Sequence, residues 1–589
     1  MNYELNSDQN KKRQSQWEAL KGLWPMISQE RNILFFAGVA TLLNSGINLV
    51  APLLIAHTVD TYIIGRNFGG VVTYALILLG LYVFGLFTSY AQTRLMGGVG
   101  QRVLFRLRNT IFNKLQELPV AFFNANKAGD LISRINNDTD KLNQFFSQTL
   151  VQLVGSVVIM IGAGIFLVSI NLKLGLAALA PAAVLLVFTQ LLSPWVKRSN
   201  AVSLTSVGGL SAEVSESLNN FKVVVAFNRR DFFRQRFEIA NDDNYKTAVK
   251  AGIANNTFTP VFGLSSNLAQ LIVLAYGVYL ITEGHFTLGL LIGFLSYVAN
   301  FYNPLRQLAA LWSNFQVALA GWDRISAILQ MQNEMVQMKD GTVTEIPHST
   351  NALLEFKDVS FRYIEDKVVL RDVNFTLEKG KTYALVGPTG GGKTTTASLM
   401  ARLYDPTEGG VYLNGKDIRT IDTSERTKKI GFILQEPILF SGTVRENILY
   451  GNEELKSLSD EALTKLLKDN GLESLLIRFD GGLEAKVATS GDALSLGQKQ
   501  LIAFMRAVLR DPELLILDEA TANIDTVTEQ LLEDILKKLP LSTTKVIIAH
   551  RLNTIENADE IFFINGCEIT PAGSMDHAVD MLLHGKRES

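Results

Sequence analysis

Six stretches of this 589-residue chain are apolar enough and long enough to cross a membrane, and they constrain its fold more than any other feature. About 20 apolar residues are needed for a helix to span the hydrocarbon core. A buried helix of a soluble protein would be shorter and amphipathic. We therefore predict six membrane spans, at about residues 33–56, 71–91, 148–169, 174–194, 260–282 and 286–303, with polar interruptions at Asn44, Asn48 and Asn300.

Lysine and arginine gather in two of the connections between these spans, and this bias predicts their orientation. Connections rich in these residues stay in the cytoplasm, whereas the other three connections are short and nearly uncharged. Both basic connections have the pattern of helices, so we expect the membrane helices to extend beyond the bilayer. The basic residues are Arg94, Arg102, Arg106, Arg108, Lys114, Lys127 and Arg134 in the first connection, and Lys197, Arg198, Lys222, Arg229, Arg230, Arg234 and Arg236 in the second.

The spans lie in one of four segments into which the chain divides. Residues 1–31 are polar with apolar residues at near-helical spacing, which fits an interfacial helix or a soluble segment. Residues 32–329 hold the spans, residues 330–351 read as a linker, and residues 352–589 have the composition of a soluble α/β domain. The formal net charge of -2 gives no argument for nucleic acid as a partner, and the single cysteine, Cys567, cannot form an intrachain disulfide.

A glycine-rich loop in the soluble domain predicts a nucleotide triphosphate site. It follows the apolar run 382–386 and precedes a helix-like stretch, which is the context that a P-loop requires. The glycines let backbone N–H groups and the helix N-terminus point at phosphate oxygens, while Lys393 adds a positive charge. The residues expected to bind ATP here are Gly387, Pro388, Thr389, Gly390, Gly391, Gly392, Lys393, Thr394 and Thr395.

Further residues that phosphoryl transfer requires follow in order. The apolar run 514–517 ends in Asp518 and Glu519, where Asp518 can hold Mg²⁺ through water and Glu519 can polarise an attacking water. Thr394 would supply a hydroxyl ligand to the same metal. A second apolar run, 545–549, ends at His550, whose imidazole can reach a γ-phosphate. Between them the sequence Leu494-Ser495-Leu496-Gly497-Gln498 precedes a helix-like run at 499–510, so a second helix N-terminus is available for phosphate.

With these motifs in this order, the chain resembles a half-transporter of the ATP-binding cassette (ABC) superfamily, of the exporter type. The resemblance implies a membrane domain of six long transmembrane helices with the type I ABC exporter fold, and an α/β P-loop nucleotide-binding domain. It also implies that Tyr363 stacks on adenine, that Gln435 contacts Mg²⁺ and the membrane domain, and that Asp525 couples two active sites across a dimer. Residues 118–134 and 220–227 correspond to the two regions that couple the domains.

In this family the signature of one domain closes over the ATP held by another, so the resemblance implies a dimer. Ser495, Gly497 and Gln498 of the signature are retained, with Glu519 as general base, His550 as γ-phosphate sensor and Lys393 as charge stabiliser. Leu496 stands where the family usually has glycine, and Thr489 where it usually has glutamate. These two departures leave open whether the second half-transporter is the same chain or a homologous one.

The leading functional hypothesis is ATP-driven export of an amphipathic, drug-like or lipid-like substrate. We expect an integral, multi-pass protein of the bacterial plasma (inner) membrane, with its nucleotide-binding domain in the cytoplasm. The alternatives are an importer built on the exporter fold and an ATP-gated channel or regulator that does not pump. Polar residues at membrane depth could line a substrate cavity or join neighbouring helices: His57, Asp60, Gln92, Asn300, Tyr302, Asn303 and Gln307.

Overall fold

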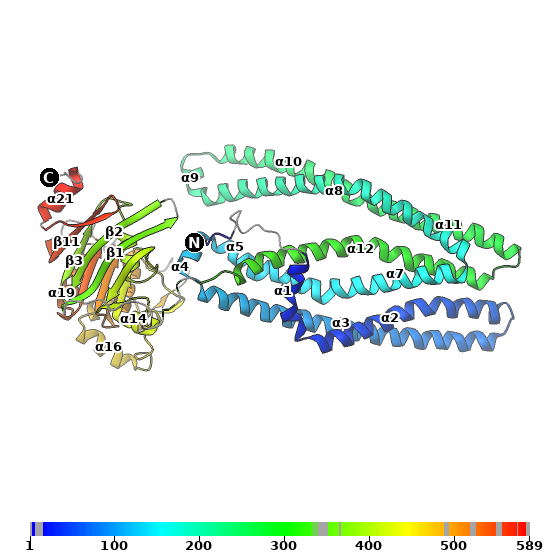
Figure 1. Ribbon diagram of the computed structural model, residues 1–589, viewed down its shortest axis with the longest axis horizontal. Helices are drawn as coiled ribbons and strands as arrows, with labels where there is room; N and C mark the ends of the chain where they lie inside the picture. Colours follow the sequence, from blue (N-terminus) through cyan, green and yellow to red (C-terminus); the bar gives the residue numbers. More distant parts are fainter. Residues whose placement is uncertain are drawn as a thin grey trace. The chain divides into compact units, whose positions relative to one another are not determined.

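The computed structural model describes residues 3–5, 16–333, 335, 337–338, 351–364, 367–487, 494–518, 526–548, 556–573 and 575–584. The chain divides into two compact units. One, called here the membrane unit, comprises Asp8–Gln116 and Ala128–Gln330, and it holds the long helices (Figure 1). The other, called here the nucleotide unit, comprises Met331–Ser589 together with the short pieces Met1–Ser7 and Glu117–Lys127. The predicted domain limits stay predictions.

All six predicted spans are found as long apolar helices. Within the described residues they run over Arg31–Ile63, Phe68–Glu117, Ala128–Ile170, Leu172–Asn219, Arg230–Thr282 and Leu288–Leu329. They comprise α2 (Arg31–Thr58), α3 (Phe68–Glu117), α5 (Ala128–Ser133), α6 (Thr139–Gln144), α7 (Leu150–Ile170), α8 (Leu172–Asn219), α10 (Arg230–Asn256), α11 (Phe258–Thr282) and α12 (Leu288–Leu329), with π-helical turns at Val59–Ile63, Arg134–Asp138 and Phe145–Thr149.

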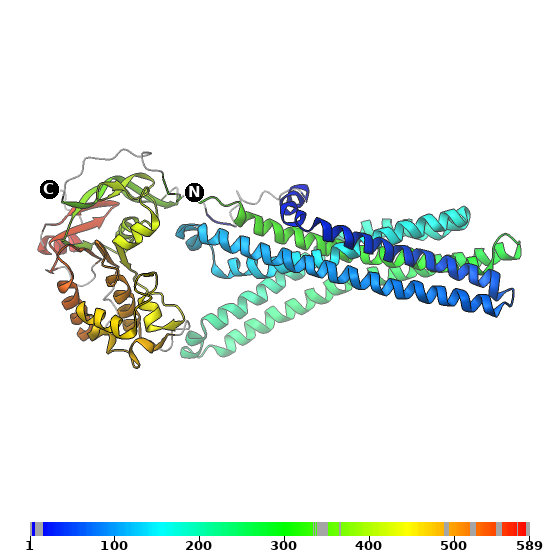
Figure 2. The same cartoon turned by 90° about the horizontal axis from the view of Figure 1, so that it is seen from below.

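The helices are much longer than a bilayer requires. The runs have 33 to 53 residues, whereas about 20 residues span the hydrocarbon core. α8 and α10 lie side by side as a long hairpin whose tip is the short helix α9, Phe221–Ala226 (Figures 1 and 2). The extensions expected from the sequence are therefore present. A separate helix, α1 (Gln16–Ser28), precedes the first span, and its position at a membrane surface stays a prediction.

Small side chains let the membrane helices approach closely. The buried cluster of this unit includes Ala163 on α7, Ala178 on α8, Ala269 on α11 and the large rings of Phe294 and Tyr297 on α12. Small residues at helix contacts permit the van der Waals packing that drives association in lipid. In contrast, the most apolar stretch of α3 has no buried residue, so its surface is available to lipid or to another chain.

The nucleotide unit contains two main β-sheets. The four-stranded sheet is antiparallel, in the order β2-β1-β4-β5, and the six-stranded sheet has the order β12-β11-β3-β10-β9-β6, with β12 antiparallel and the rest parallel. The strands are β1 (Ala352–Ile364), β2 (Lys367–Glu378), β3 (Thr382–Val386), β4 (Glu408–Leu413), β5 (Lys416–Asp417), β6 (Ile430–Ile433), β9 (Leu514–Asp518), β10 (Thr544–Ile548), β11 (Glu560–Asn565) and β12 (Glu568–Pro571). A separate ribbon pairs β7 (Gly442–Thr443) with β8 (Lys486–Val487).

Among the described residues, two large apolar cores hold this unit together, and a smaller cluster around Ala384 and Phe563 adds to them. One lies between the two sheets and α13 (Lys393–Met400) and includes Phe356, Leu385 and Ile516. The other is built mainly from helices and joins them to β9 through Leu515 and Leu517. The strands of a parallel sheet are buried on both faces, which is why β9 reads as a continuous apolar run. Within the described residues, the α-helices of the unit are α4 (Val120–Ala125), α13 (Lys393–Met400), α14 (Thr423–Lys429), α15 (Val444–Ile448), α16 (Asp460–Asp469), α17 (Glu473–Leu476), α18 (Leu496–Val508), α19 (Thr526–Lys538) and α21 (Met575–His584).

Candidate functional site

The glycine-rich loop at residues 387–392 connects β3 to α13, at the carboxyl end of a central strand of the parallel sheet. Lys393 is the first residue of α13, and its side chain turns back over the loop. Its Nζ donates to the backbone oxygens of Gly387 at 2.8 Å and Pro388 at 3.1 Å. The loop, the ammonium group and the positive end of the helix macrodipole therefore converge where an anion would bind.

Two of these glycines are required by the backbone. Gly387 has a φ of +153°, and a Cβ there would lie 2.1 Å from the backbone oxygen of Ile564 on the adjacent strand β11. Gly392 has a φ of +114° and is the N-cap of α13. Residues with a Cβ rarely adopt these conformations. The loop can therefore follow this path only with glycine at both positions.

Asp518 and Thr394 meet at the same edge of the sheet. Thr394 Oγ1 donates to Asp518 Oδ1 over 3.4 Å, and the Asp518 side chain is buried. Gln435 follows β6, the strand beside β9, and it is exposed at that edge. Hydroxyl, carboxylate and amide oxygens are the ligand types that suit Mg²⁺. The three predicted metal residues therefore fit a Mg²⁺ that keeps water and substrate phosphates as its other ligands.

Within the described ranges, no group of three or more His, Cys, Asp or Glu side chains is arranged to hold a metal ion. Mg²⁺ commonly binds through one or two carboxylates together with phosphates, rather than in an all-protein cage.

Tyr363 lies at the end of β1 with half of its side chain exposed. Its hydroxyl is within 3.0 Å of Thr395 Oγ1, on the first turn of α13, and burial raises the pKa of the Tyr363 hydroxyl. The ring also forms an aromatic cluster with Phe361 and Tyr404, with both contacts to Tyr363 close to perpendicular. An exposed ring face next to the P-loop helix can stack on a nucleotide base.

Sequence reasoning missed two residues that adjoin this cluster. Asn124 on α4 donates through Nδ2 to the hydroxyl of Tyr404 at 2.7 Å. The two residues are 280 positions apart. Asn124 lies within the range 118–134 that the resemblance marks as a coupling region, but neither residue was singled out from the sequence. A contact so distant in sequence gives no periodic or spacing signal, so only the folded structure reveals it.

Ser495 is the N-cap of α18 and forms a capping box with Gln498. Ser495 Oγ accepts from the Gln498 backbone N–H at 3.2 Å, and Gln498 Oε1 accepts from the Ser495 N–H at 2.9 Å. The predicted helix start at residue 499 is wrong, since α18 begins at Leu496 and the signature forms its first turn. Leu496 is 39% exposed, so its side chain is not a core residue. Gly497 follows it in the same turn.

Four predicted positions lie outside the described residues: Glu519, His550, Asp525 and Thr489. The strands that precede Glu519 and His550 are nonetheless described. Ile548 of β10 pairs with Leu385 on one side and with Asp518 on the other. The strand that precedes His550 therefore lies between the P-loop strand and the strand that ends in Asp518.

Three polar residues of the membrane unit join neighbouring helices. Asp60 accepts the Gly289 backbone N–H at 2.7 Å and the Thr287 hydroxyl at 2.5 Å, which caps the start of α12. Asn300 donates through Nδ2 to the backbone oxygen of Asn48 at 3.0 Å. The Tyr302 hydroxyl donates to the backbone oxygen of Ala178 at 2.9 Å. The sequence left two roles open, lining a substrate cavity or joining neighbouring helices. The second role fits Asp60, Asn300 and Tyr302.

The other polar candidates are less constrained by their surroundings. His57 packs against the rings of Tyr62 and Tyr74. Gln92 has a buried Oε1 that accepts no hydrogen bond from the described residues. Asn303 and Gln307 are exposed on α12.

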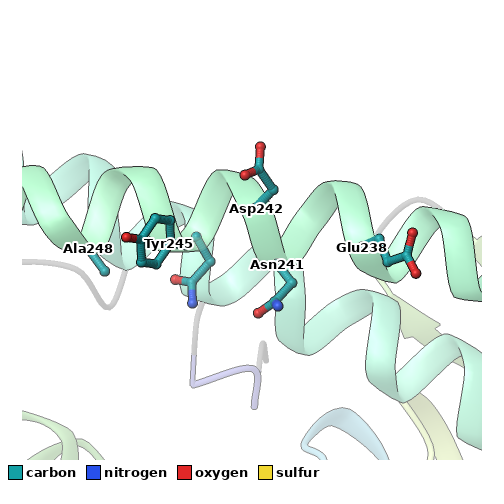
Figure 3. A pocket seen from close by; sticks show the side chains of 6 residues that line it. Glu238, Asn241, Asp242, Tyr245 and Ala248 are labelled. Atoms are coloured by element: carbon teal, nitrogen blue, oxygen red, sulfur yellow. The ribbon is translucent and has the colours of Figure 1, made fainter.

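A shallow groove lies on α10, and its lining comes from this helix (Figure 3). The side chains point in several directions around the helix rather than into a common cavity. No site is assigned to this groove. The lining residues are Glu238, Asn241, Asp242, Asn244, Tyr245 and Ala248.

Comparison with known proteins agrees with this geometry. Residues 34–305 match the family described as ABC transporter transmembrane region, and residues 370–522 match the family described as ABC transporter. An uncharacterized ABC transporter ATP-binding protein of Bacillus subtilis, YfiC, is 31% identical over 95% of this chain and 92% of its own length.

Two further relatives carry functional names. A fatty acid ABC transporter ATP-binding/permease protein of Mycobacterium tuberculosis is 33% identical over 87% of this chain and 80% of its own length. A multidrug resistance ABC transporter ATP-binding and permease protein of Lactococcus lactis is 30% identical over 94% of this chain and 92% of its own length.

Proposed function

The chain belongs to the ABC transporter family, and from this membership we propose that it exports an amphipathic, drug-like or lipid-like substrate as a dimer that works by alternating access. It is an exporter-type half-transporter with the type I exporter fold, and it couples ATP hydrolysis to transport. The names of its relatives, multidrug resistance and fatty acid transporters, support an amphipathic cargo.

One observation carries the proposal. The P-loop, Asp518 and Gln435 lie at one edge of a parallel sheet, in a chain that also has six long membrane helices. A phosphate-binding loop with oxygen ligands for Mg²⁺ supports hydrolysis of ATP. The membrane helices supply the element that hydrolysis would drive. A pump requires both, and this chain supplies both.

We assign the steps of hydrolysis to residues at this edge. The backbone N–H groups of the loop and Lys393 hold and neutralise the phosphates, while Tyr363 stacks on the base. Thr394, Gln435 and Asp518 would hold Mg²⁺, which when bound neutralises charge on the β- and γ-phosphates.

Two further residues complete the chemistry. Glu519 orients and deprotonates the attacking water, and His550 contacts the γ-phosphate. Positioning and electrostatics account for most of the catalysis of phosphoryl transfer, so these roles need little covalent chemistry from the protein.

The position of the signature supports the proposed dimer. Ser495 and Leu496 are exposed at the start of α18, where the first N–H groups of a helix have no intrahelical acceptor. We propose that Ser495, Gly497 and Gln498 bind the γ-phosphate of ATP held by a second half-transporter, and that Asp525 joins the two sites. ATP binding then favours the closed dimer, and hydrolysis releases it.

The basic connections support a proposal for the orientation of the chain. We propose that the nucleotide unit lies in the cytoplasm of a bacterium, with the helices in the plasma membrane. Short, nearly uncharged connections at 64–70, 169–175 and 282–287 support this placement. ATP is then available on the side where the nucleotide unit lies.

Two measurements on the chain purified alone in lipid nanodiscs test the proposal. Mg-ATP hydrolysis by the wild type is compared with that of Glu519→Gln, which should bind ATP with turnover largely lost. Full turnover in Glu519→Gln refutes the assignment of the base. Absence of turnover in a folded wild-type sample that binds ATP points to a heterodimer with a homologous chain.

Direction is tested in proteoliposomes. With ATP outside, transporters whose nucleotide units face outward should accumulate an amphipathic fluorescent dye or a fluorescent fatty acid in the lumen. ATP-dependent loss of preloaded dye from the lumen would instead indicate an importer. Glu519→Gln proteoliposomes provide the blank for leakage.

A further inference from the structure

We propose that Arg94 and Arg102 on α3 bind the phosphate of an anionic phospholipid, with Gly98 between them. The three residues are spaced four positions apart, so they lie along one face of the helix. Both arginines are exposed, and the glycine between them is not buried. All three belong to the membrane unit, so this lipid site is independent of the proposed ATP site.

Arg102 is held in place and still has donors to offer. Its Nε and Nη2 donate to Glu30 Oε2 at 3.1 and 2.9 Å, which fixes the plane of the guanidinium group. A Cβ on Gly98 would lie 3.1 Å from Arg102 Nη1, so the guanidinium lies over this glycine. Within the described residues, Nη1 has no hydrogen-bond partner. A phosphate oxygen beside Gly98 can therefore accept from a donor that is already oriented.

Positive charge exceeds negative charge at this place. Glu30 is shared by two arginines, since Arg106 Nη2 also donates to it, at 2.7 Å to Oε1. Arg94 forms no ion pair with any described residue, and α3 has no acidic residue before Glu117. Three guanidinium groups are thus balanced by one carboxylate. This excess of cations favours an anionic ligand, and arginine suits phosphate because its planar fork matches the phosphate oxygens.

The depth of these residues matches that of lipid phosphates. α2 and α3 run side by side (Figures 1 and 2). Glu30 lies three residues before the predicted first span, and Arg94 three residues after the predicted second span, which is about 4.5 Å along a helix in each case. The headgroup layer on each side of the hydrocarbon core is about 5–7 Å thick. Since Arg102 is bonded to Glu30, both arginines lie in or beside this layer.

The surface next to the arginines is apolar and exposed, as acyl chains require. Tyr90, Phe87 and Val83 precede Arg94 by four, seven and eleven residues, a spacing that keeps them on its face of α3. All three side chains are exposed, and the most apolar stretch of α3 has no buried residue. One helix face therefore presents cations for a phosphate and an apolar track for its acyl chains. This combination fits a phospholipid rather than a soluble phosphate.

Lys197 on α8 provides a matched control for Arg94. It is exposed and lies three residues after the predicted fourth span, at the same depth as Arg94. Four and eight residues later, however, α8 has Ala201 and Thr205, where α3 has a glycine and an arginine. Lys197 is therefore a single cation at the membrane surface that lacks the second arm of the site.

Native mass spectrometry of the full chain in detergent, without ATP, measures lipid binding directly. The probes are phosphatidylglycerol, which is anionic, and phosphatidylcholine with the same acyl chains, which is zwitterionic. We expect the wild type to bind its first phosphatidylglycerol at least about fivefold more tightly than phosphatidylcholine, because one cation near the membrane surface contributes a factor of that size.

Three variants locate the site. Arg94→Gln removes one arm and should raise the Kd for phosphatidylglycerol about fivefold, with the Kd for phosphatidylcholine within about twofold of the wild type. Gly98→Leu keeps every charge but fills the space between the arginines, and it should weaken phosphatidylglycerol binding to a similar extent. Lys197→Gln removes a charge at the same depth and should stay within about twofold of the wild type.

Each other outcome overturns the site. Equal affinities of the wild type for the two lipids, or an unchanged Kd for phosphatidylglycerol in Arg94→Gln or Gly98→Leu, would show that no anionic headgroup binds there. An equal loss in Lys197→Gln would reduce the effect to general surface charge. Displacement of phosphatidylglycerol by an equal concentration of glycerol 3-phosphate would identify a site for soluble phosphate instead of lipid.

Discussion

Gly387→Ala should weaken ATP binding strongly, and the size of the effect can be worked from one contact. The added Cβ would lie 2.1 Å from the Ile564 backbone oxygen, whereas real contacts essentially never fall below 3.0 Å. One of the two backbones must therefore move by about 0.9 Å. Phe563 of β11 pairs with Val386 of β3, so the sheet resists this movement on both sides. The phosphate-binding loop must therefore be displaced.

A displacement of that size breaks hydrogen bonds to a phosphate. An N–H···O bond at its usual length of about 2.9 Å would stretch beyond 3.5 Å, where it no longer contributes. A bond to a charged group is worth about 1.5–3 kcal/mol. Loss of one such bond raises the Kd for ATP about 10- to 150-fold. Titration of the full chain with a fluorescent ATP analogue measures the change.

Gly566→Ala is the matched control for Gly387→Ala. Gly566 also has a positive φ, +61°, and lies just after β11, but a Cβ there meets nothing within 4 Å. Alanine at position 566 should lower stability by about 1 kcal/mol, because it must take the left-handed conformation, but it should not clash with a neighbour. Its Kd for ATP should stay within about twofold of the wild type. Equal affinities in Gly387→Ala and the wild type would refute the steric argument.

Three further predictions concern other parts of the chain. Thr394→Ala should raise the Mg²⁺ concentration for half-maximal ATPase activity by about tenfold, because an oxygen ligand is lost, whereas Thr394→Ser should restore the wild-type value. Leu496→Gly should leave turnover within about twofold of the wild type, since the capping box already orients the signature, and a tenfold rise would contradict this. Glu30→Gln should lower stability by about 1–3 kcal/mol in thermal melts at pH 7, because the buried carboxylate bonds Arg102 and Arg106. Hydrogen bonds and charge from Arg102, then from Arg106, hold the pKa of Glu30 below its ordinary value of 4.5. Its stabilising effect is therefore complete above pH 4.5 and is lost as pH falls through the lowered pKa, so Glu30→Gln should remove that acid-dependent loss.

Local patterns in the sequence predicted the main elements of this fold. An apolar run of about 20 residues has few alternatives to a membrane helix, and all six were confirmed. β9 and β10 were visible because strands buried on both faces are apolar throughout. The P-loop was visible because phosphate binding requires glycine at fixed positions. Each of these signals is contained in a short stretch of sequence.

Features that depend on a distant partner were not predictable in the same way. Asp60 at the end of a span fits a substrate cavity equally well until Gly289, 229 residues away, is seen to donate to it. The start of α18 was placed three residues late, since the residues of the capping box do not look helical in sequence. Ser495 and Gln498 bond each other, so they stabilise the first turn that their propensities alone would not indicate.

A cluster of charges joins α5 and the residues that follow it to the end of α12 within the membrane unit. α5 follows α4 after two residues, and Asp130 on α5 accepts both Arg134 Nε at 2.8 Å and Arg324 Nη2, on α12, at 2.7 Å. Arg324 also pairs with Asp138, which is fully buried, at 3.2 Å. Lys141 pairs with the other oxygen of Asp138 at 2.9 Å, so this carboxylate is held from α6 as well as from α12. These ion pairs favour keeping the segment from Asp130 to Asp138 against the end of α12.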